Sequence, residues 1–218
     1  MLNCFTRSLL ALSALALGTS AAFAAPITLG TTTTASYASG TLVANSFIGG
    51  TTQAISAGGD PNPFVVNYNE TIYSGGTGAL CPTCLDFVFN FSNVATTGND
   101  PILEFTIASF IDPIVADYVA GTGTLAPTQA LMTVNGVLNF GYDDTGVLPG
   151  ESSDTLVVYT DQTTFQLGGL TFQDGATAND PGFVPAPSAA VTPEPSSLML
   201  LGTGLVSVAG AARRKFRA

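Results

Sequence analysis

Leu85-Asp86-Phe87-Val88-Phe89-Asn90-Phe91-Ser92 has the clearest alternation of side chains in this sequence. Large apolar side chains recur at every second position, and the residues between them are mostly small or polar. Because successive side chains of a β-strand point to opposite faces of its sheet, this alternation predicts a strand with one buried face. The segment therefore indicates a protein built from sheets.

The same period of two recurs further along the chain. Leu103, Phe105 and Ile107 alternate with other residues, and the run 156–159 is typical of a buried strand. Asn135-Gly136 predicts a hairpin, because this pair tolerates the two positive φ angles of a type I′ turn. A second tight hairpin is expected at Gly168-Gly169, between residues 165–167 and 170–172.

Long helical stripes are not evident in the body, although residues 112–120 could form one helical turn. Several short strands with alternating faces favour an all-β fold, a β-sandwich, with a jelly roll as one topology that would fit. We expect this body to span residues 25–174. Small residues and prolines follow, and they predict a linker over residues 175–192.

The N-terminus has the features of a secretory signal peptide over residues 1–24. Arg7 precedes an apolar region from Leu9 to Leu17, and Ala22 and Ala24 form an A-x-A cleavage site. An uncleaved N-terminal helix is the alternative. The signal predicts an exported chain.

The C-terminus carries three features in a fixed order: Pro193-Glu194-Pro195, an uncharged apolar run at residues 197–212, and a basic cluster. The run is slightly shorter than the roughly 17–25 residues that usually span a bilayer, which predicts a short transmembrane helix. The basic cluster should stay cytoplasmic and leave the body on the other side of the membrane. It consists of Arg213, Arg214, Lys215 and Arg217.

This tail, residues 193–218, resembles the PEP-CTERM sorting signal of bacterial exported proteins. The resemblance implies handling by a membrane transpeptidase of the exosortase type, with transient anchoring in the inner membrane and processing near Pro193-Glu194-Pro195. A plain C-terminal membrane anchor is the alternative. Delivery to the cell surface or to an extracellular polymer matrix is what the resemblance implies next.

The distribution of charge excludes several classes of partner. Every basic residue lies in the two terminal segments, and all 15 acidic residues except Glu194 lie in residues 25–192, which gives this region a net charge of −14 and no histidine. Nucleic acid and other polyanions are therefore disfavoured as partners. The chemistry of a nucleophile activated by histidine or lysine is disfavoured too.

Cys81 and Cys84 are the cysteine pair that remains after removal of the signal peptide. In an oxidising compartment we expect them to form a local disulfide. A redox motif of the thioredoxin type would need a helix after the second cysteine, whereas a strand is predicted there. A zinc site would need more sulfur or nitrogen ligands than the body offers.

Carboxylates are the remaining source of catalytic or metal-binding chemistry. A glycoside hydrolase needs two of them, but no spacing selects a pair among Glu70, Glu104, Asp143, Asp144 and Glu151. Several Asp/Asn-rich turns could supply oxygen ligands to Ca²⁺, although Asp and Asn beside Gly or Pro are also ordinary turn residues. The sequence assigns no catalytic residue and no firm metal site.

These features predict an exported structural or interaction protein of the cell surface or matrix, and not an enzyme. Two alternatives remain open: a carbohydrate-binding module that recognises extracellular polysaccharide, and a secreted hydrolase that uses two carboxylates.

Overall fold

The computed structural model describes residues 25–45, 53–58, 61–96, 99–110, 114–133 and 135–186. In these ranges the chain forms thirteen strands and one short helix, and the strands assemble into two sheets. The all-β architecture predicted from the alternation of apolar residues is therefore confirmed.

One sheet has six strands in the order β1 (Ala25–Ile27), β9 (Gln129–Met132), β10 (Leu138–Gly141), β7 (Glu104–Ile107), β12 (Phe165–Asp174) and β13 (Ala176–Pro185). The other has β2 (Leu29–Thr31), β8 (Ile114–Val119), β11 (Thr155–Thr160), β6 (Leu85–Asn93), β5 (Val65–Ser74) and β3 (Thr41–Asn45), with β4 (Gln53–Ser56) also paired to β5. The β2–β8 pair is parallel, and the other strand pairs are antiparallel.

Phenylalanines from both sheets form the core between them. Phe89 and Phe91 of β6 contact Phe105 of β7 at ring-centroid distances of 5.3 and 5.4 Å, and Phe105 stacks on Phe172 of β12 at 4.8 Å. All four side chains are buried. The alternating face predicted for residues 85–92 is thus one side of the core, and burial of these rings from water is a main source of its stability.

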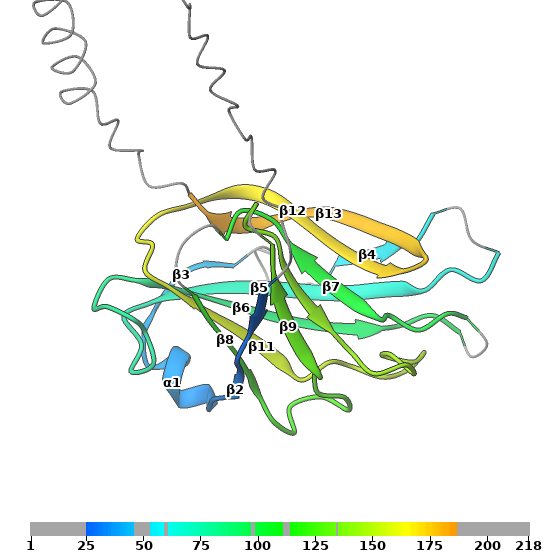
Figure 1. The fold of residues 1–218 in the computed structure, drawn as a ribbon, viewed down its shortest axis with the longest axis horizontal. Helices are drawn as coiled ribbons and strands as arrows, with labels where there is room; N and C mark the ends of the chain where they lie inside the picture. The colour runs from blue at the N-terminus through cyan, green and yellow to red at the C-terminus, as the bar shows by residue number, and fades with distance from the viewer. Residues whose placement is uncertain are drawn as a thin grey trace, which may run out of the picture.

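The opposite face of β6 is also covered along part of its length. Helix α1 (Thr34–Ala38) places Tyr37 in a second apolar cluster with Val88 and Tyr159, and Figure 1 shows α1 at the opposite side of the molecule from β12 and β13. This helix was not predicted. Asp86, expected to face solvent by alternation, is instead fully buried.

The hairpin predicted at Gly168-Gly169 is wrong. Residues 165–174 form one continuous strand, and its turn lies at Gly175, which has a φ of 69°. Gly168 serves close packing: a Cβ there would lie 2.5 Å from a methyl group of Val184 on β13. The glycine pair therefore reflects the approach of a neighbouring strand.

The linker predicted over residues 175–192 also begins too early. Residues 176–185 form β13, which pairs with the whole length of β12. Their prolines are compatible with a strand because β13 is the outer strand of its sheet, where a missing N–H donor on the free side has little cost. The described body therefore continues to residue 186, and Figure 1 shows β13 beside β12.

The hairpin at Asn135-Gly136 is confirmed, but its turn differs from the prediction. Strands β9 and β10 pair with Met132 opposite Leu138, and Gly136 has a φ of 73°. The Gly136 amide donates to the Thr133 carbonyl at 3.0 Å. A longer loop that ends in a left-handed glycine thus replaces the type I′ turn.

The helical turn considered at residues 112–120 is wrong as well, since residues 114–119 form β8.

Candidate functional site

A groove of about 190 Å³ lies on the outer face of the seven-stranded sheet, over β5 and β6. Asn67 and Asn69 of β5 lie directly opposite Ser92 and Asn90 of β6 in the antiparallel register. Side chains at these positions share the face that points away from the phenylalanine core. Thr122, Ser152 and Ser153 complete the polar lining, and Phe91 is its one aromatic member.

Several groups in this groove have hydrogen-bonding capacity to spare. In the described part of the chain, the side chains of Asn67, Ser92 and Ser152 make no hydrogen bond, and the Oδ1 atom of Asn69 is buried without a partner. Asn90 uses only its Oδ1, which accepts from the Thr155 hydroxyl at 2.6 Å. Buried polar atoms are nearly always bonded, so the Asn69 Oδ1 atom is the exceptional group of this groove. Asn67, Ser92 and Ser152 are partly exposed, which leaves their side chains accessible to a ligand.

Asn93 shows what a structural asparagine looks like in the same strand. Its side chain is fully buried, and its Nδ2 donates to the carbonyls of Asp100 and Val147 at 2.9 and 3.1 Å. Its Oδ1 accepts from the Ala95 amide. The Asn93 side chain therefore bonds to neighbouring loops with both its Nδ2 and its Oδ1. Of the groove asparagines, Asn90 uses only its Oδ1 in this way.

Glu70 is a second unusual feature, because it lies fully buried between the two sheets. Its Oε2 accepts from the Phe183 amide of β13 at 2.6 Å. Burial raises the pKa of Glu70 to about 8, although the bond from Phe183 acts in the opposite direction. Next to it, the Tyr68 hydroxyl donates to Asp180 of β13 at 2.6 Å. These polar contacts attach β13 to β5 of the other sheet.

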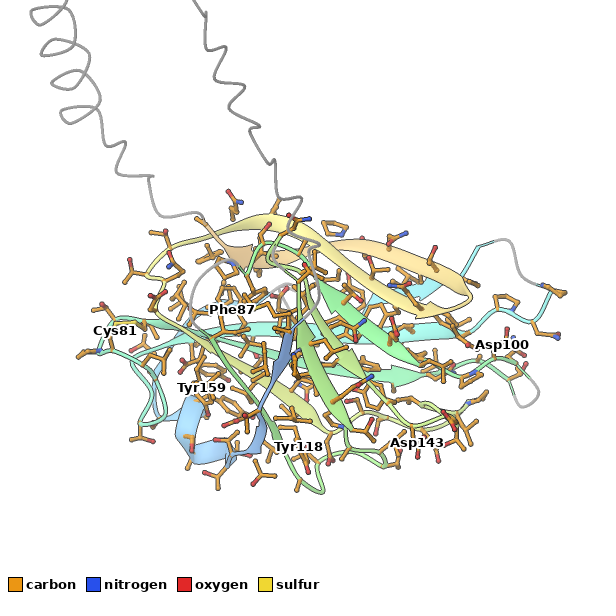
Figure 2. The ribbon with its side chains drawn as sticks, viewed as in Figure 1. Cys81, Phe87, Asp100, Tyr118, Asp143 and Tyr159 are labelled. Atoms are coloured by element: carbon orange, nitrogen blue, oxygen red, sulfur yellow. A yellow bond between two sulfur atoms is a disulfide. The ribbon has the colours of Figure 1, made fainter. Side chains whose placement is uncertain are left out.

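Asp86 is buried on the outer face of β6, opposite Tyr73 and Tyr159 in the register. The aromatic rings of Tyr37 and Tyr73 lie 5.4 Å apart over this region. Neither carboxylate oxygen of Asp86 has a hydrogen-bond partner among the described residues, and burial raises its pKa to about 7. Figure 2 shows Tyr159 on this side of the molecule, away from Asp100 and Asp143.

The five carboxylates considered for catalysis lie on two strands, β5 and β7, and in the turns before β11. Glu70 faces the core, whereas Glu104 of β7 accepts from Asn139 at 2.8 Å. Asp143, Asp144 and Glu151 belong to turns before β11. The Oε2 atom of Glu151 accepts from the Leu148 amide at 3.0 Å.

The Asp/Asn-rich turns show ordinary turn chemistry. Asp143 Oδ1 accepts from the hydroxyl and amide of Thr145 and from the Gly146 amide, and these bonds, chiefly that from the hydroxyl, lower the pKa of Asp143. Asn99 similarly accepts from Thr96 and donates to Pro63. Among the described residues, no group of three His, Cys, Asp or Glu side chains could hold a metal ion.

The predicted disulfide is confirmed. Cys81 and Cys84 are joined by a bond of 2.07 Å with a Cα–Cα distance of 5.0 Å, and β6 follows directly, as expected. Their loop also contacts α1, because the Gly78 amide donates to the Ser36 carbonyl at 2.9 Å. Figure 2 shows Cys81 at one end of the body and Asp100 and Asp143 at the other.

The targeting residues lie outside the described part of the chain. These are Ala22 and Ala24 of the signal peptide, Pro193, Glu194 and Pro195 of the tail, the apolar run 197–212, and the basic cluster Arg213, Arg214, Lys215 and Arg217. Within the described ranges, no helix has the length and apolar character needed to cross a membrane.

The groove could not be identified without the register, but the sequence does contain a signal for it. Asparagine is disfavoured in strands, yet Asn67, Asn69 and Asn90 occur in two neighbouring ones. Their placement at every second position predicts a polar face. Which of them face each other depends on the pairing of β5 with β6.

Comparison with known proteins identifies the tail and not the body. Residues 191–215 match the family model of the PEP-CTERM protein-sorting motif. The resemblance inferred from Pro193-Glu194-Pro195 and the residues after it is thereby confirmed, and the motif implies an exported protein that is targeted to exosortase. No curated protein and no solved structure matches the chain.

Proposed function

We propose that this protein is a structural and interaction protein of the cell surface or the extracellular matrix, delivered there by its C-terminal sorting signal. The observation that carries the proposal is the sorting motif at residues 191–215, which follows the end of β13 at Pro185 by only a few residues. Processing near Pro193-Glu194-Pro195 would separate the entire folded body from the tail.

The chemistry of the body supports a role outside the cytoplasm. Its cysteines form a disulfide, which persists in oxidising compartments. The absence of Lys, Arg and His from residues 25–192 favours solubility and disfavours adhesion to polyanions.

The sorting step is testable by substitution of the motif. We expect the variant Pro193→Ala/Glu194→Ala/Pro195→Ala to accumulate as full-length precursor in the membrane fraction, while the unmodified chain is processed. Immunoblotting of fractionated cells measures both forms. Pro187→Ala is the matched control, since it removes a nearby proline and leaves the motif intact.

Normal processing of the triple variant would refute the sorting role and leave a plain anchor. Treatment of intact cells with a non-permeant biotinylation reagent for carboxylates then tests location. Labelling of the processed body supports surface delivery, whereas a body that is protected until the cells are opened contradicts it.

A further inference from the structure

The groove on the seven-stranded sheet has its polar side chains arranged in rows across the strands. One row runs from Asn67 through Ser92 to Ser152, because Asn67 pairs with Ser92 and Ser92 forms a bridge with Ser152. A second row contains Asn69 and Asn90. Adjacent strands lie about 4.8 Å apart, so each row presents groups at regular intervals to a ligand lying across the sheet.

Every polar side chain in these rows is an amide or a hydroxyl. An amide offers two donors and one accepting oxygen, and a hydroxyl offers one donor and two lone pairs. The hydroxyl groups of a sugar likewise donate and accept at the same time. Because the side chains of Asn67, Ser92 and Ser152 make no hydrogen bond within the described chain, they can bond to such a ligand without giving up an internal contact.

The negative charge of the molecule favours neutral carbohydrates over anionic ones as ligands. No lining residue is charged, and residues 25–192 contain 14 acidic residues and no basic ones. A polyanionic glycan would be repelled by this field and would find no cation to pair with. An uncharged glycan meets neither obstacle.

We propose that this groove is a binding site for neutral polysaccharide, with Asn67 and Ser92 as direct contacts and Asn69, Asn90 and Ser152 beside them. The inference rests on the proposed function in one respect: the processed body must reach an extracellular polymer to use the site. Phe91 is buried, so the groove offers no exposed aromatic ring for stacking. Binding therefore depends on hydrogen bonds and on repetition of the sugar unit along a polymer.

Affinity electrophoresis in native gels tests the site with the full exported chain, purified in mild detergent. The probes are a soluble glucan, mannan and galactan, with alginate as the anionic comparison. We expect at least one neutral polymer to retard the protein and alginate to have no effect. Asn67→Ala/Ser92→Ala should weaken the interaction about tenfold, which is the effect expected for two lost hydrogen bonds.

Thr171→Ala/Asn179→Ala is the matched control. These residues form a hydroxyl–amide pair on the exposed face of the other sheet, with a Thr171 Oγ1–Asn179 Oδ1 distance of 2.7 Å. We expect this variant to bind like the unmodified chain, and circular dichroism confirms that both variants are folded. If Asn67→Ala/Ser92→Ala fails to fold, Asn67→Asp tests the same contact, since a carboxylate there loses the amide donors.

Three results would overturn the assignment: no retardation by any neutral polymer, equal weakening in the groove and control variants, or stronger retardation by alginate. This experiment is separate from the test of sorting. A chain that binds glucan but stays in the membrane contradicts the proposed function alone. A chain that reaches the surface but ignores every neutral polymer contradicts the groove assignment alone.

Discussion

At the scale of single residues, Glu70 and Asp86 stand out because their carboxyl groups are fully buried. Removal from water disfavours their charged forms, so their pKa values rise to about 8 and about 7. Nearby cations, which usually offset such burial, do not occur in residues 25–192. Both groups therefore remain largely protonated in mild acid.

The pKa of Glu70 predicts how stability depends on pH. Its value in the folded state exceeds its ordinary value of 4.5, so the folded state retains a proton that the unfolded state loses. Its contribution is complete below about pH 4.5 and is lost as pH rises toward about 8, with a limiting slope of about 1.4 kcal/mol per pH unit. We expect Glu70→Gln to flatten this part of the profile, as measured by urea unfolding at several pH values.

Asp144→Asn is the control for this measurement, because Asp144 is exposed in a turn. It removes one carboxylate without touching the core. The same decline with pH in the Glu70→Gln variant and in the unmodified chain would show that other groups cause it.

At the scale of elements, β13 is the strand that the amino-acid composition did not predict. Proline and small residues suggested a linker, yet Ala178 and Val184 of this strand belong to the core, and its Phe183 amide bonds Glu70. We expect a chain ending at Asp174 to lose resistance to protease, because β12 and Glu70 would lose their partners. A chain ending at Ala186 keeps β13 and should resist digestion. Equal resistance of the two chains would show that β13 is dispensable.

The disulfide loop is an element with a smaller expected effect. A four-residue ring removes little entropy from the unfolded chain, so Cys81→Ser/Cys84→Ser should lower the free energy of unfolding by about 2 kcal/mol. The contact of Gly78 with Ser36 remains available in that variant. Urea denaturation measures the loss, with reduced unmodified protein as the comparison. A much larger loss would mean that the bridge also holds α1 over Asp86.

The strands differ in how well local patterns predict them. Residues 85–92 are predictable because their alternation gives the strand one strongly apolar face. That face is buried whichever residues of the other sheet pack against it. Gly168-Gly169 misleads because a glycine needed for close packing looks the same in sequence as one needed for a turn. Helix α1 is missed because it is a single short turn whose position depends on contacts of Tyr37 with distant strands.

At the scale of the whole molecule, the sorting signal could be identified from the sequence, whereas the groove over β5 and β6 could not. Pro193-Glu194-Pro195, the apolar run and the basic cluster follow one another along the chain, so their order carries the information without a structure. The groove combines β5, β6 and a segment more than fifty residues later, Ser152-Ser153. Such a site exists only once the sheet has paired.

The net charge of the body also predicts how its stability depends on pH and salt. With 14 acidic and no basic residues in positions 25–192, carboxylates repel one another more strongly in the folded state than in the expanded chain. We expect the melting temperature to be highest in mild acid and to fall toward about pH 8, in the direction already set by Glu70 and Asp86. Sodium chloride should raise the melting temperature more at about pH 8 than in mild acid, because screening of the repulsion acts over about 8 Å at physiological ionic strength.

A chelator should leave the melting temperature unchanged, since the side-chain oxygens of Asp143 and Asn99 already accept hydrogen bonds within their own turns. Thermal melts with Ca²⁺ and with chelator check this, and a fall in melting temperature on chelation would restore calcium as a ligand of the body.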